Sequence, residues 1–521
     1  MRPLNWTPVK APSLGLWLGL LPGLAAAEQP LSAIDWLNAP VPVTTRITPQ
    51  TSPAPTKPEP PVSKSALAPD VSVSSLDEAG VAAVGLLPKS VTGLPASLWQ
   101  ASKSADLVRE MRAQDPLALP ALQSLFYTLI LAEAEPPFDA GRGHDMLKER
   151  VAQLMELGAV EPAQALLERA GPDVPQLFAL WFDVTLLTGT EDAACSALNA
   201  KRYLSTDMAT RIYCEARGGD WAAAAVSYDT ASALGLLSPV EKRLLALFID
   251  PELIEEAADL APPSTISPLA FRLYEAAGQA LPTGSLPRAF AMADLRATSG
   301  WKAELEAAER LSRTGALSEN RLFDIYTARQ PAASGGIWDR VEALQRFDTA
   351  VRSRDPGAVA RTLPPAWRAM QDSHLEVPFA RYYAQALAPL PMTGEAHELA
   401  FAIAMLSPDY ESLAAKMTPQ TDEERFLAAL ARGEPQNAPT SDPLSRSIAR
   451  AFSETEVPRD LAPLLAEGKL GEAILRAMTL FASGMEGNYT DLDAALAGFR
   501  AMGLEDTARR AGLQLMLLNQ G

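Results

Sequence analysis

The chain has 521 residues, 63 acidic against 45 basic side chains, and a formal net charge of −18. Phosphate-rich partners are bound through clustered Lys and Arg, so this acid excess argues against nucleic acid or an anionic membrane surface as the main partner. Three His and two Cys exclude zinc-finger arrays, iron–sulfur clusters and disulfide-dense scaffolds. A hydrophobic share of 48% is enough for a large core.

Residues 1–27 have the three-part pattern of a secretory signal. Arg2 and Lys10 make a positive start, an apolar stretch covers 14–24, and three alanines ending at Ala27 offer a cleavage site. The apolar stretch is about 11 residues long, whereas about 20 are needed to span a bilayer. We expect cleavage after Ala27 and a periplasmic protein, which loses two positive charges and so goes from −18 to −20. The alternatives are a retained anchor and a buried helix.

A proline-rich stretch follows the expected cleavage site. Nine prolines fall between Asn38 and Asp70. Such a run lacks backbone donors and apolar periodicity, so it predicts an extended, disordered tether over 28–70. Within it, Ile34, Trp36 and Leu37 form a candidate docking peptide, the alternatives being packing on the chain's own body or disorder.

Residues 71–95 are expected to be irregular chain lying on the main body, and helical patterning dominates from there to the end. In 337–351 the apolar residues share one helical face: Ile337, Val341, Leu344, Phe347 and Val351. Clusters of Gly, Pro, Asp and Ser are expected to separate the helices, at 135–137, 171–173, 261–263, 364–365 and 407–409. No sustained alternation typical of strands is present. The predicted fold class is all-α.

We expect two helical-repeat lobes within this body. The stretch 259–267, with Pro262 and Pro263, is the best boundary. It divides an N-terminal lobe, 96–262, from a C-terminal lobe, 263–521.

Residues 219–231 resemble the second helix of a tetratricopeptide repeat. The matching positions are Gly219, Asp220, Trp221, Ala224, Tyr228 and Ala231. Small residues let two helices approach closely, and large ones fill the groove between hairpins. Similar spacing begins at Gly158, Gly468 and Gly503, but Gly158 and Gly219 are 61 residues apart instead of the family's 34. The resemblance implies a divergent α-solenoid of helical hairpins, with a helical bundle or an α/α toroid as alternatives.

The whole chain also resembles an uncharacterised family of exported proteins from alphaproteobacteria. Residues 285–290 and 333–340 carry this likeness. The family has no established activity, so the resemblance implies no functional residue.

Cys195 and Cys214 are 19 residues apart on what are expected to be successive helices. In an oxidising compartment they predict a disulfide across a helical hairpin, the alternative being two buried free thiols. The thioredoxin-type spacing of two residues is absent.

The sequence offers no recognisable catalytic, cofactor-binding or metal-binding motif. Only His397 is closely flanked by carboxylates, but Glu395 lies two positions away and points to another helical face, so a chance surface cluster is expected. A solvated, mixed-charge helix face is expected for Glu304, Glu306, Glu309, Arg310 and Arg313. Most aromatics are expected in the core, the alternative being a concave binding face: Trp181, Trp221, Trp301, Trp338, Trp367, Tyr382 and Tyr383.

These features favour a noncatalytic periplasmic scaffold or adaptor without a cofactor, which binds an envelope protein or peptide through its helical-repeat surface. Two other classes remain open. One is a carbohydrate-active envelope enzyme, either an α/α toroid or a relative of the lytic transglycosylases. The other is a periplasmic assembly chaperone, which would bind its partner transiently.

Overall fold

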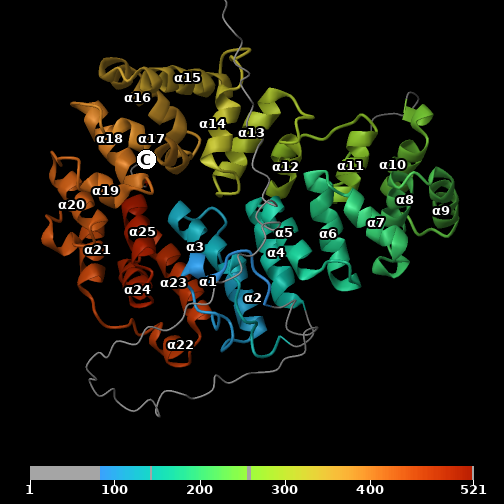
Figure 1. Ribbon diagram of the computed structural model, residues 1–521, viewed down its shortest axis with the longest axis horizontal. Helices are drawn as coiled ribbons and strands as arrows, with labels where there is room; N and C mark the ends of the chain where they lie inside the picture. Colours follow the sequence, from blue (N-terminus) through green and yellow to red (C-terminus); the bar gives the residue numbers. More distant parts are fainter. Residues whose placement is uncertain (1–82, 141–143, 255–259, 519–521) are drawn as a thin grey trace, which may run out of the picture. The chain divides into compact units, whose positions relative to one another are not determined.

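The structure, a computed structural model, describes residues 83–140, 144–254 and 260–518. Over these ranges the chain forms 25 α-helices and no strand, apart from one isolated bridge between Leu87 and Ala132 (Figure 1). The predicted all-α fold is confirmed. The expected signal sequence, the tether, and the docking residues Ile34, Trp36 and Leu37 lie outside the described residues.

The helices follow one another with short connections. The first ten are α1 (Lys89–Thr92), α2 (Ser104–Arg112), α3 (Pro120–Leu131), α4 (Asp145–Leu157), α5 (Val160–Ala170), α6 (Pro175–Thr188), α7 (Asp192–Ala200), α8 (Met208–Arg217), α9 (Trp221–Ala233) and α10 (Pro239–Ile249). The next eight are α11 (Pro268–Ala276), α12 (Ala291–Asp294), α13 (Trp301–Ser312), α14 (Glu319–Thr327), α15 (Ile337–Ser353), α16 (Pro356–Gln371), α17 (Glu376–Leu387) and α18 (Glu395–Leu406). The last seven are α19 (Tyr410–Ala414), α20 (Asp422–Ala431), α21 (Pro443–Ser453), α22 (Ala462–Ala466), α23 (Leu470–Met485), α24 (Tyr489–Ala501) and α25 (Glu505–Leu518).

Neighbouring helices pack in pairs, as in a solenoid of helical hairpins. The closest pairs are α5 with α6, α8 with α9, α15 with α16, α17 with α18, and α23 with α24. The predicted face of α15 is buried, because all five of its apolar residues are at most 8% exposed. Among the described residues, no helix has the length and apolarity needed to cross a membrane.

The glycine spacing correctly locates four helix starts. Gly158, Gly219, Gly468 and Gly503 each precede a helix and have φ between 73° and 87°, a region that favours glycine. These helices are α5, α9, α23 and α25. The glycine turns the chain sharply, so that the following helix folds back on the preceding one.

One expected helix break is wrong. Pro364 and Pro365 lie inside α16, which runs on to Gln371. Proline in a helix interior removes a backbone hydrogen bond and normally ends the helix. Here Leu363, Ala366 and Trp367 are buried, and α16 packs along α15 and α18. Tertiary packing therefore outweighs the local preference for a break.

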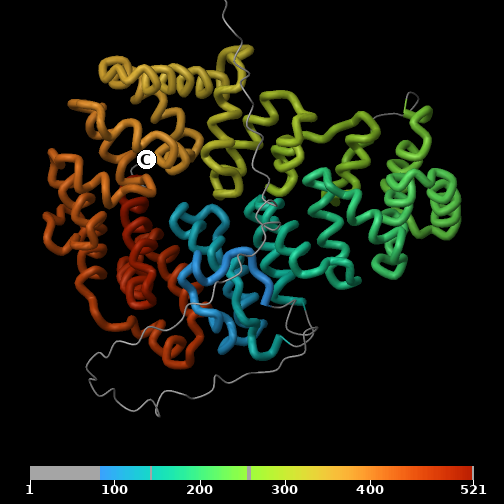
Figure 2. The backbone as a smooth tube through the Cα atoms, viewed as in Figure 1, coloured from blue at the N-terminus to red at the C-terminus, as the bar shows by residue number. Residues whose placement is uncertain are grey.

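The first and last helices of the described body pack against each other. α2 contacts α23 and α3 contacts α25, as the blue and red ends of the coloured tube show in Figure 2. Trp99, which is 2% exposed, lies against Gly471, where an added Cβ would stand 2.3 Å from the indole ring. The amide of Gly471 donates to the carbonyl of Leu98 over 3.1 Å. Only glycine leaves room for this contact.

The middle of the chain also returns on itself. α6 packs against α11 and α12, and α4 packs against the 3-10 turn Arg288–Phe290. In consequence α4–α6 and α11–α13 form two adjoining layers. This return brings the end of α13 next to the turn between α4 and α5, where Thr314 Oγ1 donates to the carbonyl of Leu157 over 2.6 Å.

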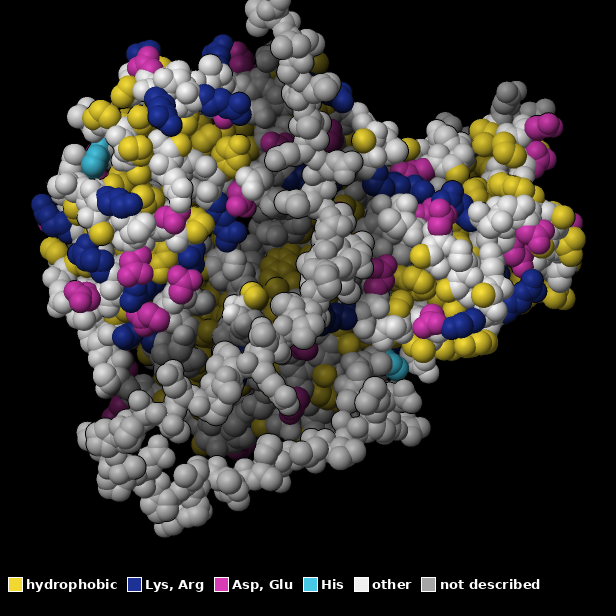
Figure 3. Space-filling view, in the orientation of Figure 1, with side chains coloured by type: hydrophobic (Ala, Val, Ile, Leu, Met, Phe, Trp, Pro, Cys, Tyr) yellow, Lys and Arg dark blue, Asp and Glu magenta, His cyan; other side chains and the backbone are white. Residues whose placement is uncertain are grey.

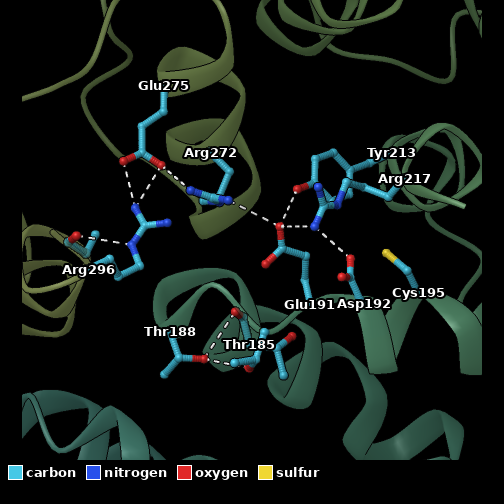
Figure 4. Close-up of polar contacts among 12 residues, drawn as sticks. Thr185, Thr188, Glu191, Asp192, Cys195, Tyr213, Arg217, Arg272, Glu275 and Arg296 are labelled. Atoms are coloured by element: carbon cyan, nitrogen blue, oxygen red, sulfur yellow. Dashed lines mark hydrogen bonds and ion pairs between the residues drawn. The ribbon is translucent and has the colours of Figure 1, made fainter. Parts of the chain in front are cut away.

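A row of alternating charges, buried at Glu191 and partly exposed beyond it, joins the α7–α8 hairpin to α11 and to the chain after α12 (Figure 4). Glu191 is fully buried and accepts from Tyr213 Oη over 2.9 Å and from Arg272 Nη2 over 3.2 Å. Arg272 also donates to Glu275 over 2.6 Å, and Glu275 accepts from Arg296 over 2.7 Å. Removing one partner from such a set leaves an uncompensated buried charge, which is strongly destabilising.

Cys195 of α7 and Cys214 of α8 form a disulfide, with their Cα atoms 4.7 Å apart. The bond therefore closes the α7–α8 hairpin beside Glu191. A crosslink that closes a loop of this size stabilises the fold by about 3 kcal/mol in the chain-entropy model.

We expect Gly471→Ala to lower the free energy of unfolding by about 1–3 kcal/mol, because the added methyl group overlaps the ring of Trp99 and forces α23 away from α2. Urea unfolding followed by circular dichroism measures the change. Gly284→Ala is the matched control, since a Cβ there meets nothing within 4 Å. Equal stability of the two variants would contradict the proposed close contact.

Candidate functional site

A cavity of about 960 Å³ lies where helices from distant parts of the chain meet. Its walls come from α3, the α4–α5 turn, the end of α13, the start of α14 and the first turns of α17. Met485 of α23 and Leu518 of α25 complete the lining. Figure 3 shows the molecule hollowed near the centre of one face, with hydrophobic side chains inside the hollow.

Helix α3 forms one wall and is held at both sides. Its N-terminal amide at Ala121 donates to Gln514 Oε1 of α25 over 2.8 Å. The buried side chain of Gln123 donates to the carbonyl of Arg313 over 3.0 Å, which ties α3 to the end of α13. Tyr127 and Thr128, one turn further along the helix, therefore face the cavity from a fixed position.

The end of α13 forms the opposite wall. Arg310 and Arg313 lie three residues apart, on the same side of the helix. The chain then turns at Gly315, whose φ of 71° suits glycine. Arg310 donates to the carbonyls of Thr283 over 2.9 Å and Leu286 over 2.5 Å, which binds α13 to the segment that carries Arg288.

The cavity is positively charged within an acidic protein. Its lining contains four arginines and two glutamates, which give a formal charge of +2 with His374 neutral: Arg288, Arg310, Arg313, Arg381, Glu319 and Glu376. The whole chain carries −18. A site lined with one sign of charge raises the local concentration of ligands of the opposite sign.

Arg288 and Arg310 form no ion pair with a carboxylate within the described part of the chain. Arg288 donates to the carbonyl of Glu156 over 2.6 Å, and Arg310 donates to carbonyls alone. Burial lowers the pKa of both guanidinium groups. Neighbouring arginines lower the pKa of Arg310 further, whereas Glu156, Tyr127 and Asp115 oppose the decrease at Arg288. Both groups stay charged at neutral pH, because an arginine pKa starts above 12.

Arg313 has an acidic partner, Glu309, which it shares with Arg340. Glu309 is 2% exposed and accepts from Tyr326 Oη over 2.6 Å and from Arg340 Nη2 over 2.8 Å. Arg313 reaches the same carboxylate at 3.4 Å and donates to the carbonyl of Ser373 over 2.7 Å. One buried carboxylate thus compensates two guanidinium groups.

The solvated face expected on α13 is therefore wrong for Glu309, Arg310 and Arg313, whereas Glu306 is 56% exposed as expected. The spacing of charges along α13 is that of a surface helix, but α14, α15 and the α16–α17 turn supply buried partners for them. Charge spacing along a helix cannot report which partners another helix contributes.

Two hydroxyl groups at the cavity have no hydrogen-bond partner within the described chain. They are Tyr127 Oη and Ser312 Oγ, and both atoms are buried. Ser312 is 4% exposed as a residue. Burial also raises the pKa of the Tyr127 phenol above its ordinary value. A buried polar atom without a partner costs free energy, which a bound ligand can recover.

The three histidines lie apart from one another. His144 precedes α4, and His374 lines the cavity with a positive φ of 55°. The surface cluster expected around His397 is wrong, because its side chain is only 13% exposed and its Nε2 lies 3.8 Å from Glu424 Oε2 of α20. That pairing joins residues 27 positions apart, which no local spacing reveals.

Most of the aromatic residues singled out in the sequence lie in the core, and Trp221 is exposed. Trp181, Trp301 and Trp367 are 5–7% exposed and belong to the core, and Trp338 packs on Trp301 with ring centroids 5.2 Å apart. Trp221 is 48% exposed and touches the ring of Phe248. Tyr383 is buried, whereas Arg381 beside Tyr382 reaches the cavity.

The repeat-like positions of α9 are only partly buried. Ala224 and Ala231 are fully buried against neighbouring helices, as small residues at a helix crossing should be. Tyr228 is half-buried and donates to the carbonyl of Lys242 over 3.1 Å. Gly219 forms the turn, and Trp221 at the helix start stays half outside the groove that it was expected to fill.

Comparison of the chain with protein-family models, with curated proteins and with solved structures finds no match.

Sequence reasoning missed the cavity residues. Tyr127, Arg288, Ser312 and Glu376 carry no motif, and nothing in their spacing links them.

Glu376 predicts a pH dependence of stability. Burial raises the pKa of this carboxyl from 4.5 to about 7 in the folded protein. Between these values the folded state keeps a proton that the unfolded state has lost, so the free energy of unfolding falls as pH rises through this window. We expect Glu376→Gln to match the wild type near pH 4.5 and to exceed it at pH 8 by about 2 kcal/mol.

Urea unfolding of both proteins at several pH values tests this expectation. Asp183, whose pKa is also raised to about 7 by burial and by Asp207, titrates in the same window, so the informative quantity is the difference between variant and wild type. Glu306→Gln, at a carboxylate that is 56% exposed, is the control. A difference for Glu376→Gln that stays constant from pH 4.5 to pH 8 would count against a raised pKa.

Proposed function

We propose that the protein is a noncatalytic scaffold or adaptor of the bacterial periplasm, which binds a segment of an envelope protein in the cavity between α3, α13 and α17. The observation that carries the proposal is the make-up of this cavity. Guanidinium and hydroxyl donors stand there beside apolar side chains such as Leu131, Pro162 and Leu317. Sites for peptides and small ligands combine apolar walls with a few convergent polar groups in this way.

The solenoid architecture supports the same proposal. Helical-hairpin solenoids present extended surfaces built from many successive helices, and such surfaces suit extended segments of a partner. The lining here comes from helices that are separated by up to about 400 residues in the chain, so the cavity exists only in the folded body. The periplasmic location rests on the signal-like pattern of residues 1–27.

Site-directed crosslinking in intact cells tests the proposal. A photo-crosslinkable amino acid in place of Thr128, which lines the cavity, is expected to give a reproducible adduct with one envelope protein. The same amino acid in place of Ser196, an exposed residue of α7, is the control. Ser124→Trp should fill the cavity and remove the Thr128 adduct, whereas Ser196→Trp should leave it intact.

Two outcomes would refute the proposal. One is the absence of any adduct from position 128 with a normal level of folded protein. The other is the same set of adducts from positions 128 and 196, since this would show contact without a preferred surface.

A further inference from the structure

We propose that Arg288, Arg310, Tyr127 and Ser312 form a carboxylate-binding subsite in the cavity, which holds an acidic side chain of the bound segment. The inference rests on the proposed function and adds the chemical class of the ligand. It depends on three observations on the described part of the chain: the clustering of the arginines, the absence of ion pairs to Arg288 and Arg310, and the two hydroxyl groups without hydrogen bonds.

The arginines are clustered by backbone contacts. Arg310 Nη2 donates to the carbonyl of Leu286, two residues before Arg288. The stem of Arg288 packs on the α4–α5 turn, where a Cβ on Gly158 would lie 3.0 Å from its Cγ. These contacts hold the guanidinium groups in place before any ligand arrives. An arginine fixed in this way loses little side-chain entropy when it binds.

The positive charge of this cluster is only partly balanced by neighbouring carboxylates. Glu156 and Asp115 attract Arg288 from beyond ion-pair distance, and no carboxylate of the described residues forms an ion pair with Arg288 or Arg310. Glu309, the nearest buried acid on α13, is already occupied by Arg340 and Tyr326. Glu319 and Glu376 line the cavity but form no ion pair with Arg288 or Arg310 among the described residues. Like charges in a partly buried site repel one another, and an anion between them relieves this repulsion.

The hydroxyl groups point to the same ligand. Ser312 lies between Arg310 and Arg313 in the last turn of α13. Tyr127 faces that turn from α3, since a Cβ on Gly315 would lie 3.6 Å from its Cε2. Both hydroxyls can donate to an oxygen atom, and neither has an acceptor within the described chain. A carboxylate offers two acceptor oxygens, enough for guanidinium and hydroxyl donors together.

The walls around the cluster indicate that the carboxylate belongs to a peptide. Leu117, Leu119, Leu131 and Leu317 line the cavity beside the arginines. A free inorganic anion gains nothing from apolar walls, whereas a peptide with alternating acidic and apolar residues can contact the arginines and the leucines together. Its acidic residues would reach the arginines, and its apolar residues would cover the leucines.

Binding of a fluorescein-labelled peptide of alternating Glu and Leu tests the inference by anisotropy with the full chain. We expect saturable binding, and at least tenfold weaker binding of the matched peptide with Gln in place of Glu. Arg288→Gln should weaken the Glu peptide about tenfold or more, since charge-assisted hydrogen bonds are lost. Arg346→Gln, at an exposed arginine of α15, is the control.

Tyr127→Phe and Ser312→Ala test the subsite with variants that are expected to fold as well as the wild type. Each removes a hydroxyl that bonds to nothing within the described chain, so melting temperature without peptide should stay the same or rise. Affinity for the Glu peptide should fall about three- to tenfold in each variant. Tyr228→Phe, which removes a hydroxyl bonded to the carbonyl of Lys242, is the matched control and should leave affinity unchanged.

The inference is overturned if the Glu and Gln peptides bind equally, or if all three cavity variants keep wild-type affinity. Inorganic phosphate that binds to the cluster while the Glu peptide does not would also overturn it, in favour of a phosphate site. If these binding tests fail but the crosslinked adduct from position 128 is still found in cells, only the carboxylate assignment is refuted and the proposed function stands. Loss of that adduct would remove the proposed function itself.

Discussion

The rest of the structure depends on the contact that joins the beginning and the end of the helical body. Trp99 packs directly on the backbone of Gly471, and the amide of that glycine bonds to the carbonyl of Leu98. An open solenoid gains stability from neighbouring repeats alone, whereas here helices from the two ends bury each other. The same closure places α3 against α25 and so builds one wall of the cavity.

Buried charge is the second organising feature. Glu191 and Glu309 each sit on one side of a helix and accept hydrogen bonds from a tyrosine and an arginine. Glu309 connects the successive helices α13, α14 and α15, whereas Glu191 joins the α7–α8 hairpin to α11, 81 residues further along the chain. The arginines of the cavity, in contrast, form no ion pair at Arg288 and Arg310 among the described residues.

Local features of the sequence predicted local structure well. The apolar spacing of 337–351 describes the buried face of α15, and glycines such as Gly219 mark where hairpins turn. Both depend on forces within one or two helical turns. Prediction failed where a distant helix decides the outcome, as at Pro364, which the packing of α16 keeps inside a helix. It failed in the same way for Arg310 and His397, whose partners come from other elements.

The sequence by itself determined the all-α class, the hairpin turns and the pairing of the two cysteines on successive helices, because periodicity, glycine conformation and short loops act over a few residues. Only the tertiary structure decided that α3, α13 and α17 enclose a cavity, and that Arg288 and Arg310 meet there without an ion pair to any carboxylate of the described residues. The physical reason is that a binding site requires side chains from distant helices to converge. That convergence is set by how the layers pack, and no spacing along the chain encodes it.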